Sequence, residues 1–241
     1  GKPADTGKYD GYFEGLNIKP RFMIPLLLMI LFLFAGSMVM IGRMDMAEVY
    51  RNPIESSSAA DRLTPEQIDM QVEMMAKYST AMTITGPILF FPLLALLVAG
   101  LMMLGIYVTG GEVKGGEESP GQEGGGRFAR VFAVATGSLF FYTVVSVILT
   151  AAVILLASDP NSIDLNNPVF TNPAGLVDPK TSRALYTLLT RVDIVDWYTI
   201  FLMGLGLSKV VNKCSVGKGM ALIGFWYVLF ALLGTGLAVV F

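Results

Sequence analysis

Five long apolar segments, separated by polar stretches, dominate the pattern of the chain. None has Asp, Glu, Lys or Arg deep inside it, and each has about 20 residues or more, enough for a helix to cross roughly 30 Å of hydrocarbon. Because a backbone in lipid must satisfy its hydrogen bonds within its own segment, the pattern predicts an all-α, polytopic membrane protein, a bundle of five transmembrane helices. The predicted spans are residues 22–42, 82–108, 131–156, 194–213 and 219–241.

The remaining residues form an N-terminal arm and the loops between the spans. We expect residues 1–21 to be a cytoplasmic arm, either irregular or an interfacial stretch, because Gly7, Gly11 and Gly15 each cost a helix about 1 kcal/mol relative to Ala. Residues 22–241 then form one transmembrane domain. The first apolar run follows roughly 20 mostly polar residues and has no small-residue cleavage site ahead of a soluble domain, so we expect a span and not a cleaved signal peptide.

Short amphipathic helices are predicted in both outside loops. The sequence Thr64-Pro65-Glu66-Gln67 is a helix start, with Thr as N-cap, Pro at the first helical position and Gln closing a capping box. Apolar residues then follow at helical spacing, which predicts a helix that lies in the headgroup region and runs into the second span. Residues 181–192 carry leucines on one face and form the second predicted loop helix.

Other segments are predicted to be connections or bends. Ser56–Ala60 is predicted to be a flexible turn, and residues 109–127, rich in Gly and Glu, a flexible inside linker without a phosphate-binding pattern. In the second span, Pro87 and Pro92 each remove one backbone hydrogen bond and kink the helix. They fit either a gating hinge or simple packing.

Composition and charge agree with a membrane domain and suggest an orientation. Apolar residues make up 54% of the chain and charged residues 15%, against about 25% charged in soluble domains. With the N-terminus inside, the inside segments hold ten of the 17 Lys and Arg residues. The positive-inside rule therefore predicts a cytoplasmic N-terminus and an outside C-terminus. The chain has no N-x-[ST] site, which fits a bacterial cytoplasmic membrane.

The sequence offers little catalytic chemistry. It contains no histidine, the commonest general base and metal ligand, and this excludes a Ser-His or Cys-His nucleophile. Its single cysteine, Cys214, cannot form an internal disulfide and fits either a palmitoylation site or an ordinary thiol in a short inside loop. We predict no catalytic, cofactor or metal-binding residue, no cofactor and no nucleic-acid partner, and we expect that the protein is not an enzyme.

Two sets of residues are candidates for packing or for the membrane interface. Small residues spaced four apart let helices approach closely, either within one molecule or between partners. Ionisable residues near span ends fix the position of a helix, and intramembrane acids are functional candidates. For Asp196 we expect an interfacial position, with Arg191 or Arg183 as its candidate partner. The packing candidates are Ala133, Gly137, Gly204, Ser208, Gly234 and Ala238, and the interfacial candidates are Asp193, Asp196, Lys209 and Lys213.

Two stretches resemble a known family. One is Asp193-Ile-Val-Asp-Trp-Tyr-Thr-Ile-Phe-Leu-Met-Gly-Leu-Gly-Leu-Ser208 with the following Val216-Gly-Lys-Gly-Met-Ala221, and the other is Gly124-Gly-Gly-Arg-Phe-Ala-Arg-Val-Phe-Ala-Val134. They are similar to the aspartate-led aromatic helix, the small basic loop and the glycine-rich helix entry of the Yip family (Ypt/Rab-interacting integral membrane proteins), especially its bacterial members. The resemblance implies a non-enzymatic membrane protein that works with small GTPases in vesicle traffic or with exporters of the ABC class.

We therefore expect an accessory or interaction subunit of a larger membrane complex. Its expected partners are the lipid bilayer and other integral membrane proteins, either exporter subunits or a second copy of the chain. The main alternative is a transporter or channel for a small molecule or ion. That class usually carries buried charge, broken helices or an inverted repeat, and only the prolines of the second span point to it. An intramembrane enzyme is a third alternative.

Overall fold

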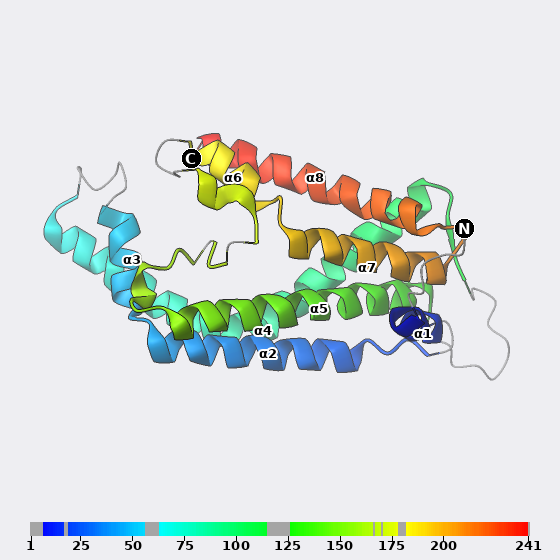
Figure 1. Cartoon of the computed structure of the whole chain (residues 1–241), viewed down its shortest axis with the longest axis horizontal. Coiled ribbons are helices and arrows are strands. Elements are labelled where there is room, and N and C mark those ends of the chain that lie inside the picture. Colours follow the sequence, from blue (N-terminus) through cyan, green and yellow to red (C-terminus); the bar gives the residue numbers. More distant parts are fainter. Residues whose placement is uncertain are drawn as a thin grey trace. The chain divides into compact units, whose positions relative to one another are not determined.

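The computed structural model describes residues 7–16, 19–55, 63–114, 126–165, 167–169, 171–177 and 182–240 (Figure 1). In this part of the chain nearly all regular structure is helical, and the strands form a single two-stranded ribbon. The prediction of an all-α chain is therefore confirmed. The predicted turn at Ser56–Ala60 and residues 115–125 of the predicted linker lie outside the described residues.

Four helices are long and apolar enough to cross a membrane, which is compatible with a multi-pass membrane protein. Many of their large apolar side chains stay exposed, among them Leu27, Leu93 and Phe225. The helix α7 (Ile194–Val210), which corresponds to the predicted fourth span, has 17 residues and is not among the four. The four are α2 (Met23–Arg43), α4 (Pro65–Val108), α5 (Arg127–Leu156) and residues Val216–Gly236 of α8 (Val216–Val240).

Short elements connect the long helices, and the chain divides into two compact units. Unit 1 comprises Gly1–Met29, Leu93–Tyr142 and Phe170–Phe241, and unit 2 comprises Ile30–Pro92 and Thr143–Val169. The short elements are α1 (Gly7–Gly15), α3 (Met46–Glu55), β1 (Glu112–Val113), η2 (Pro160–Ser162), η3 (Pro173–Leu176), α6 (Arg183–Thr190) and β2 (Val211–Asn212).

In unit 2, a side chain of α2 completes the hydrogen bonding of α4. Pro87 has no N–H to donate to the carbonyl of Thr83, four residues earlier. The buried hydroxyl of Ser37 donates to that carbonyl at 2.7 Å instead. Serine side chains are one of the known ways to satisfy a carbonyl freed by proline in a membrane helix. The helix α4 runs without interruption through both prolines, and the Ser37 bond compensates the first of them.

The start of α4 is the predicted capping box, and it is confirmed. The Thr64 N–H donates to Gln67 Oε1 at 2.9 Å, and the Gln67 N–H donates to Thr64 Oγ1 at 3.3 Å. From Pro65 the helix continues for 44 residues. The expected loop helix is thus the first part of α4, and no break separates it from the apolar part that follows.

The helix α3 was not predicted. Asp45 caps it by accepting from the N–H groups of Ala47 (2.9 Å) and Glu48 (3.4 Å). Asn161, from η2, accepts from the Asp45 N–H at 2.8 Å and donates to Glu48 Oε2 at 2.6 Å. Below these bonds a buried apolar cluster closes one end of unit 2. Its members are Met44, Met46, Val49 and Ile154.

In unit 1, α7 and α8 form a helical hairpin whose backbones touch near the connecting loop. A Cβ added to Gly219 would lie 2.7 Å from the carbonyl oxygen of Gly204 and 2.8 Å from its Cα. The two glycines are therefore required for this approach, as in other close helix pairs with small residues at the crossing. Lys213 turns the chain between the helices with a φ of 53°, in the left-handed region.

A short antiparallel ribbon joins the loop after α4 to the end of α7. Glu112 pairs with Asn212, and Val113 pairs with Val211. Beyond the ribbon, the Lys114 N–H donates to the carbonyl of Val210 at 2.8 Å. The Lys114 carbonyl in turn accepts from the guanidinium of the buried Arg130, at the start of α5.

The expectation of an irregular N-terminal arm was wrong for residues 7–15, which form α1. Tertiary packing outweighs the glycines, since Phe13 and Leu16 are only 3% and 1% exposed. A Cβ on Gly206 of α7 would lie 2.9 Å from the ring of Phe13, so that glycine makes room for the phenylalanine. Glu14 forms a 3.0 Å ion pair with Lys209 of α7.

Candidate functional site

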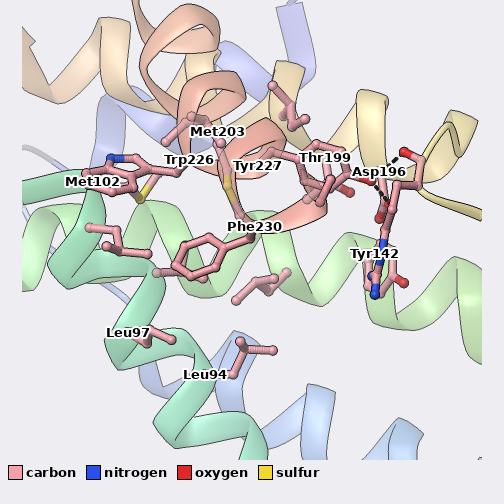
Figure 2. A pocket seen from close by; sticks show the side chains of 17 residues that line it. Leu94, Leu97, Met102, Tyr142, Asp196, Thr199, Met203, Trp226, Tyr227 and Phe230 are labelled. Carbon is pink, nitrogen blue, oxygen red and sulfur yellow. Dashed lines mark hydrogen bonds between the residues drawn. The ribbon is translucent and has the colours of Figure 1, made fainter. Parts of the chain in front are cut away.

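Unit 1 contains a partly open cavity of about 470 Å³ between four helices, which we call the unit 1 cavity (Figure 2). One wall is α4 from Leu94 to Met102, and it contributes only apolar side chains. Helices α5, α7 and α8 form the other walls. The labelled polar residues lie toward one end of the cavity in Figure 2, and Met102 and Trp226 lie toward the other. These polar residues are Tyr142, Asp196, Thr199 and Tyr227, and Arg191 also lines the cavity.

Asp196 and Tyr227 form the central polar contact of this site. The Tyr227 hydroxyl lies 2.5 Å from Asp196 Oδ2 and 2.6 Å from the backbone carbonyl oxygen of Arg191. The bonds link the first turn of α7, the turn that precedes it and α8. In the described part of the chain Asp196 forms no salt bridge, so the candidate ion pair with Arg191 is not seen. The side chain of Arg183, the other candidate partner, lies outside the described residues.

The bond to Tyr227 places Asp196 beside the middle of α8. Tyr227 is the twelfth of the 21 residues of the candidate span Val216–Gly236, about 16 Å from its start at 1.5 Å per residue. From the sequence we expect Asp196 at the membrane interface, because it lies one turn into its helix. The helix α8, however, continues well beyond the start of α7, and α6 packs against α8 there (Figure 1).

Asp193 has a structural role that its position in the sequence did not reveal. It is the N-cap of α7, and its carboxylate accepts from the N–H of Val195 at 2.7 Å. The hydroxyl of Thr171 also donates to this carboxylate, and the Asn172 amide does so at 3.4 Å. Asp193 therefore ties the segment before η3 to the start of α7, and it does not line the unit 1 cavity.

The two lysines at the other end of α7 differ from each other. Lys209 pairs with Glu14 of α1, so its charge helps to hold α1 in place. Lys213 is exposed and forms the left-handed turn before α8. Next to it, Cys214 is half-buried, and burial raises the pKa of its thiol, an effect that nearby Lys218 partly opposes.

The predicted packing residues are mostly used inside unit 1. Ala133 is fully buried, Gly137 makes room for the Tyr12 hydroxyl, and Gly204 touches α8. The Ser208 hydroxyl donates to the carbonyl of Leu205 in its own helix at 2.7 Å. Two candidates remain without such a role: a Cβ on Gly234 would meet nothing within 4 Å, and the side chain of Ala238 lies outside the described residues.

The unit 1 cavity combines apolar walls with a few polar side chains. No group of three His, Cys, Asp or Glu residues that could hold a metal ion occurs among the described residues. Tyr142, Trp226 and Tyr227, which also line the cavity, were not among the residues predicted from the sequence. A usable signal was present, since Asp196, Thr199 and Met203 share one face of α7 at helical spacing.

Comparisons with protein-family models, with curated proteins and with solved structures found no match to this chain. The resemblance to the Yip family therefore stays a prediction.

Proposed function

We propose that this chain is a membrane protein that binds, and carries across the membrane, an apolar or amphiphilic small molecule in the unit 1 cavity. The observation that carries the proposal is the cavity itself, an apolar space with a few polar groups gathered at one end. Ligand sites typically have this composition, in which the apolar walls supply affinity and the polar groups fix orientation. An amphiphile has an apolar chain that suits the walls and a polar headgroup that suits the polar end.

The position of Asp196 favours transport within this class. An acid beside the middle of a candidate span is expensive to keep in a membrane and usually marks a substrate or ion pathway. In addition, the helical chain is interrupted beside Tyr227. The turn between α6 and α7 lies there, and its Arg191 carbonyl accepts from the Tyr227 hydroxyl. Transporters commonly build their sites from such interrupted helices.

The proposal includes five spans, with α7 as the shortest. Its 17 residues are at the lower end of the range of about 17–25 residues for a membrane helix. With the positive-inside rule, the N-terminus and the α7–α8 loop are inside and the C-terminus is outside. The bacterial cytoplasmic membrane is the proposed location.

The accessory role that the sequence suggested has less support. Its candidate interfaces were small-residue faces, and Ala133, Gly137 and Gly204 pack within unit 1. An accessory role stays a prediction, which a mild-detergent pulldown from native membranes with mass spectrometry tests. A stoichiometric membrane partner would support it.

The cavity contains its own probe for a binding experiment. The chain has two tryptophans, and Trp226 lines the cavity whereas Trp197 does not. A Trp197→Phe variant in nanodiscs leaves the fluorescence of Trp226 alone. Amphiphiles with a brominated acyl chain quench an indole on contact, so we expect saturable quenching at low mole fractions of the brominated molecule.

Replacing either of two alanines on α8 by phenylalanine provides a matched pair of variants. Ala231→Phe puts a ring into the cavity and is expected to weaken binding about tenfold or more. Ala221→Phe, on an exposed part of the same helix, is expected to leave binding unchanged. Quenching that rises in proportion to bulk lipid, equally in both variants, would overturn the proposal. Flux of the bound amphiphile between leaflets then distinguishes a carrier from a binding protein.

A further inference from the structure

We infer that the unit 1 cavity takes an amphiphile with an anionic headgroup, which Arg191 recognises beside a protonated Asp196. The inference rests on the proposed function and specifies its ligand. It follows from the number of protons available at the Tyr227 hydroxyl and from the charges that line the cavity.

The Tyr227 hydroxyl has two close acceptors and one proton. Asp196 Oδ2 lies 2.5 Å from it and the carbonyl oxygen of Arg191 lies 2.6 Å from it. A carbonyl and an ionised carboxylate only accept hydrogen bonds, so a single O–H cannot satisfy both. If Asp196 carries a proton, it donates to the Tyr227 oxygen, and Tyr227 donates to the carbonyl. Both short contacts are then hydrogen bonds.

In the described part of the chain no salt bridge compensates a charge on Asp196, and Arg191 is the cation that lines the same cavity. From α5 the cavity receives Tyr142, from α8 Tyr227, and from the turn after α6 Arg191. The wall formed by α4 has no titratable side chain in the cavity. On α7 itself, Asp193 is one turn away, and its carboxylate accepts from Val195, Thr171 and Asn172. A second negative charge on Asp196 would repel that of Asp193.

With Asp196 neutral, Arg191 is the remaining charge that lines the cavity. In the described part of the chain its guanidinium forms no salt bridge. A guanidinium presents a planar fork of donors that matches a carboxylate or a phosphate group. The headgroup of the ligand is therefore a fatty-acid carboxylate or a lipid phosphate, and its acyl chain lies along the apolar wall formed by Leu94, Leu97 and Met102.

The test compares headgroups on one brominated chain of fixed length, using the Trp226 signal in the Trp197→Phe background. The probes carry a sulfate, a neutral alcohol or a trimethylammonium group, none of which changes its charge between about pH 6 and about pH 9. We expect the alkyl sulfate to bind about tenfold or more tightly than the other two at the lower pH. Carboxylate and monoester phosphate versions then distinguish the two natural sources.

Three variants locate the effect. Arg191→Gln is expected to abolish the preference for the sulfate and to leave binding of the alcohol unchanged, which also shows that the variant is folded. Arg191→Lys retains the charge and is expected to restore part of the preference. Raising the pH should weaken sulfate binding in the parent protein, because Asp196 then loses its proton, whereas Asp196→Asn should bind the sulfate equally at both pH values.

The outcomes separate this inference from the proposed function. If none of the probes quenches Trp226 saturably, the proposed function fails. If all three headgroups bind equally, or if Arg191→Gln retains the preference, the cavity binds amphiphiles but the inference about the anionic headgroup is overturned. Sulfate binding in the parent protein that is independent of pH and weaker than in Asp196→Asn would show that Asp196 is ionised already at the lower pH, and it would overturn the inference.

Discussion

The hydroxyl of Ser37 in α2 donates to the carbonyl of Thr83 in α4, the carbonyl that Pro87 leaves without its helical donor. The contact is buried, since Ser37 is 8% exposed. One polar atom on a neighbouring helix thus compensates a backbone defect at Pro87. This explains how α4 can be a continuous helix with a proline inside it.

Removal of this hydroxyl should destabilise the protein by an amount that depends on Pro87. We expect Ser37→Ala to lower the free energy of unfolding by about 1 kcal/mol, because a buried carbonyl loses its donor. Pro87→Ala provides a backbone N–H for the same carbonyl, so in that background Ser37→Ala should cost much less. Thermal unfolding of the four proteins of this double-mutant cycle in one detergent measures the difference. Equal costs in both backgrounds would show that Ser37 does not act through Thr83.

The close contact of α7 and α8 predicts a strong difference between two glycines of α8. Gly219→Ala places a methyl group against backbone atoms of Gly204, which cannot move aside as a side chain could. We expect a loss of about 1–3 kcal/mol, the usual cost of overpacking. Gly224→Ala meets nothing within 4 Å and should be neutral or slightly stabilising, because alanine favours a helix. Chemical unfolding monitored by tryptophan fluorescence compares them, and a similar loss in both would contradict the contact.

The single thiol should react slowly at neutral pH. Burial raises the pKa of Cys214, and only the thiolate attacks an alkylating reagent. Below this raised pKa the thiolate fraction, and therefore the rate with iodoacetamide, increases about tenfold per pH unit. We expect the rate of the folded protein to be below that of the denatured chain at pH 7 and to approach it as pH rises. Mass spectrometry of the alkylated fraction over time measures both, and a faster reaction in the folded protein would be incompatible with this environment.

The same thiol tests the orientation of the chain. With the N-terminus inside, Cys214 faces the cytoplasm, so a membrane-impermeant maleimide should label it in inverted vesicles and not in intact cells. Ser162→Cys in a Cys214→Ser background puts the only thiol on an exposed residue of η2. The proposed topology places η2 on the other side of the membrane. This variant should show the reverse pattern. Labelling of both positions from one side would contradict the five-span topology.

The packing of α1 predicts different effects for substitutions at two neighbouring residues. Phe13→Ala removes a ring that is 3% exposed and fits against Gly206, so α1 should detach from α7. We expect hydrogen exchange of residues 7–16 to become faster, without a change in α8. Glu14→Gln breaks only the exposed ion pair with Lys209 and should have a small effect, because such pairs contribute about 0–1 kcal/mol. Peptide-level exchange with mass spectrometry compares the two, and equal protection in all three proteins would refute the proposed anchor.

The long apolar helices could be predicted because their signal is local. A run of apolar residues and a capping box are both read within one segment, and Thr64 and Gln67 make the bonds that the sequence indicates. The helix α3 had a similar local signal in Asp45, its N-cap, and the sequence analysis did not use it. The helix α1 had none, since Phe13 is held by Gly206, far along the chain.

The candidate site shows the same limit more strongly. The residue types of the cavity were visible, and Asp196 was a candidate, but its partner was not. Tyr227 belongs to another helix, and the pairing depends on how far α8 extends beyond the start of α7. No periodicity within one segment contains this offset, so the sequence did not indicate that Asp196 pairs with Tyr227.

The hydrogen bond between the Arg130 guanidinium and the Lys114 carbonyl also makes the chain a convenient fusion scaffold. It holds the two ends of the α4–α5 connection next to each other, and the ribbon of Glu112 and Asn212 supports one of them. Closing a longer loop between fixed ends costs little, about 0.6 kcal/mol for each doubling of its length. A fluorescent protein or an affinity domain inserted between these ends should therefore leave the helices of unit 1 in register, and in the proposed topology it reports on the cytoplasmic side.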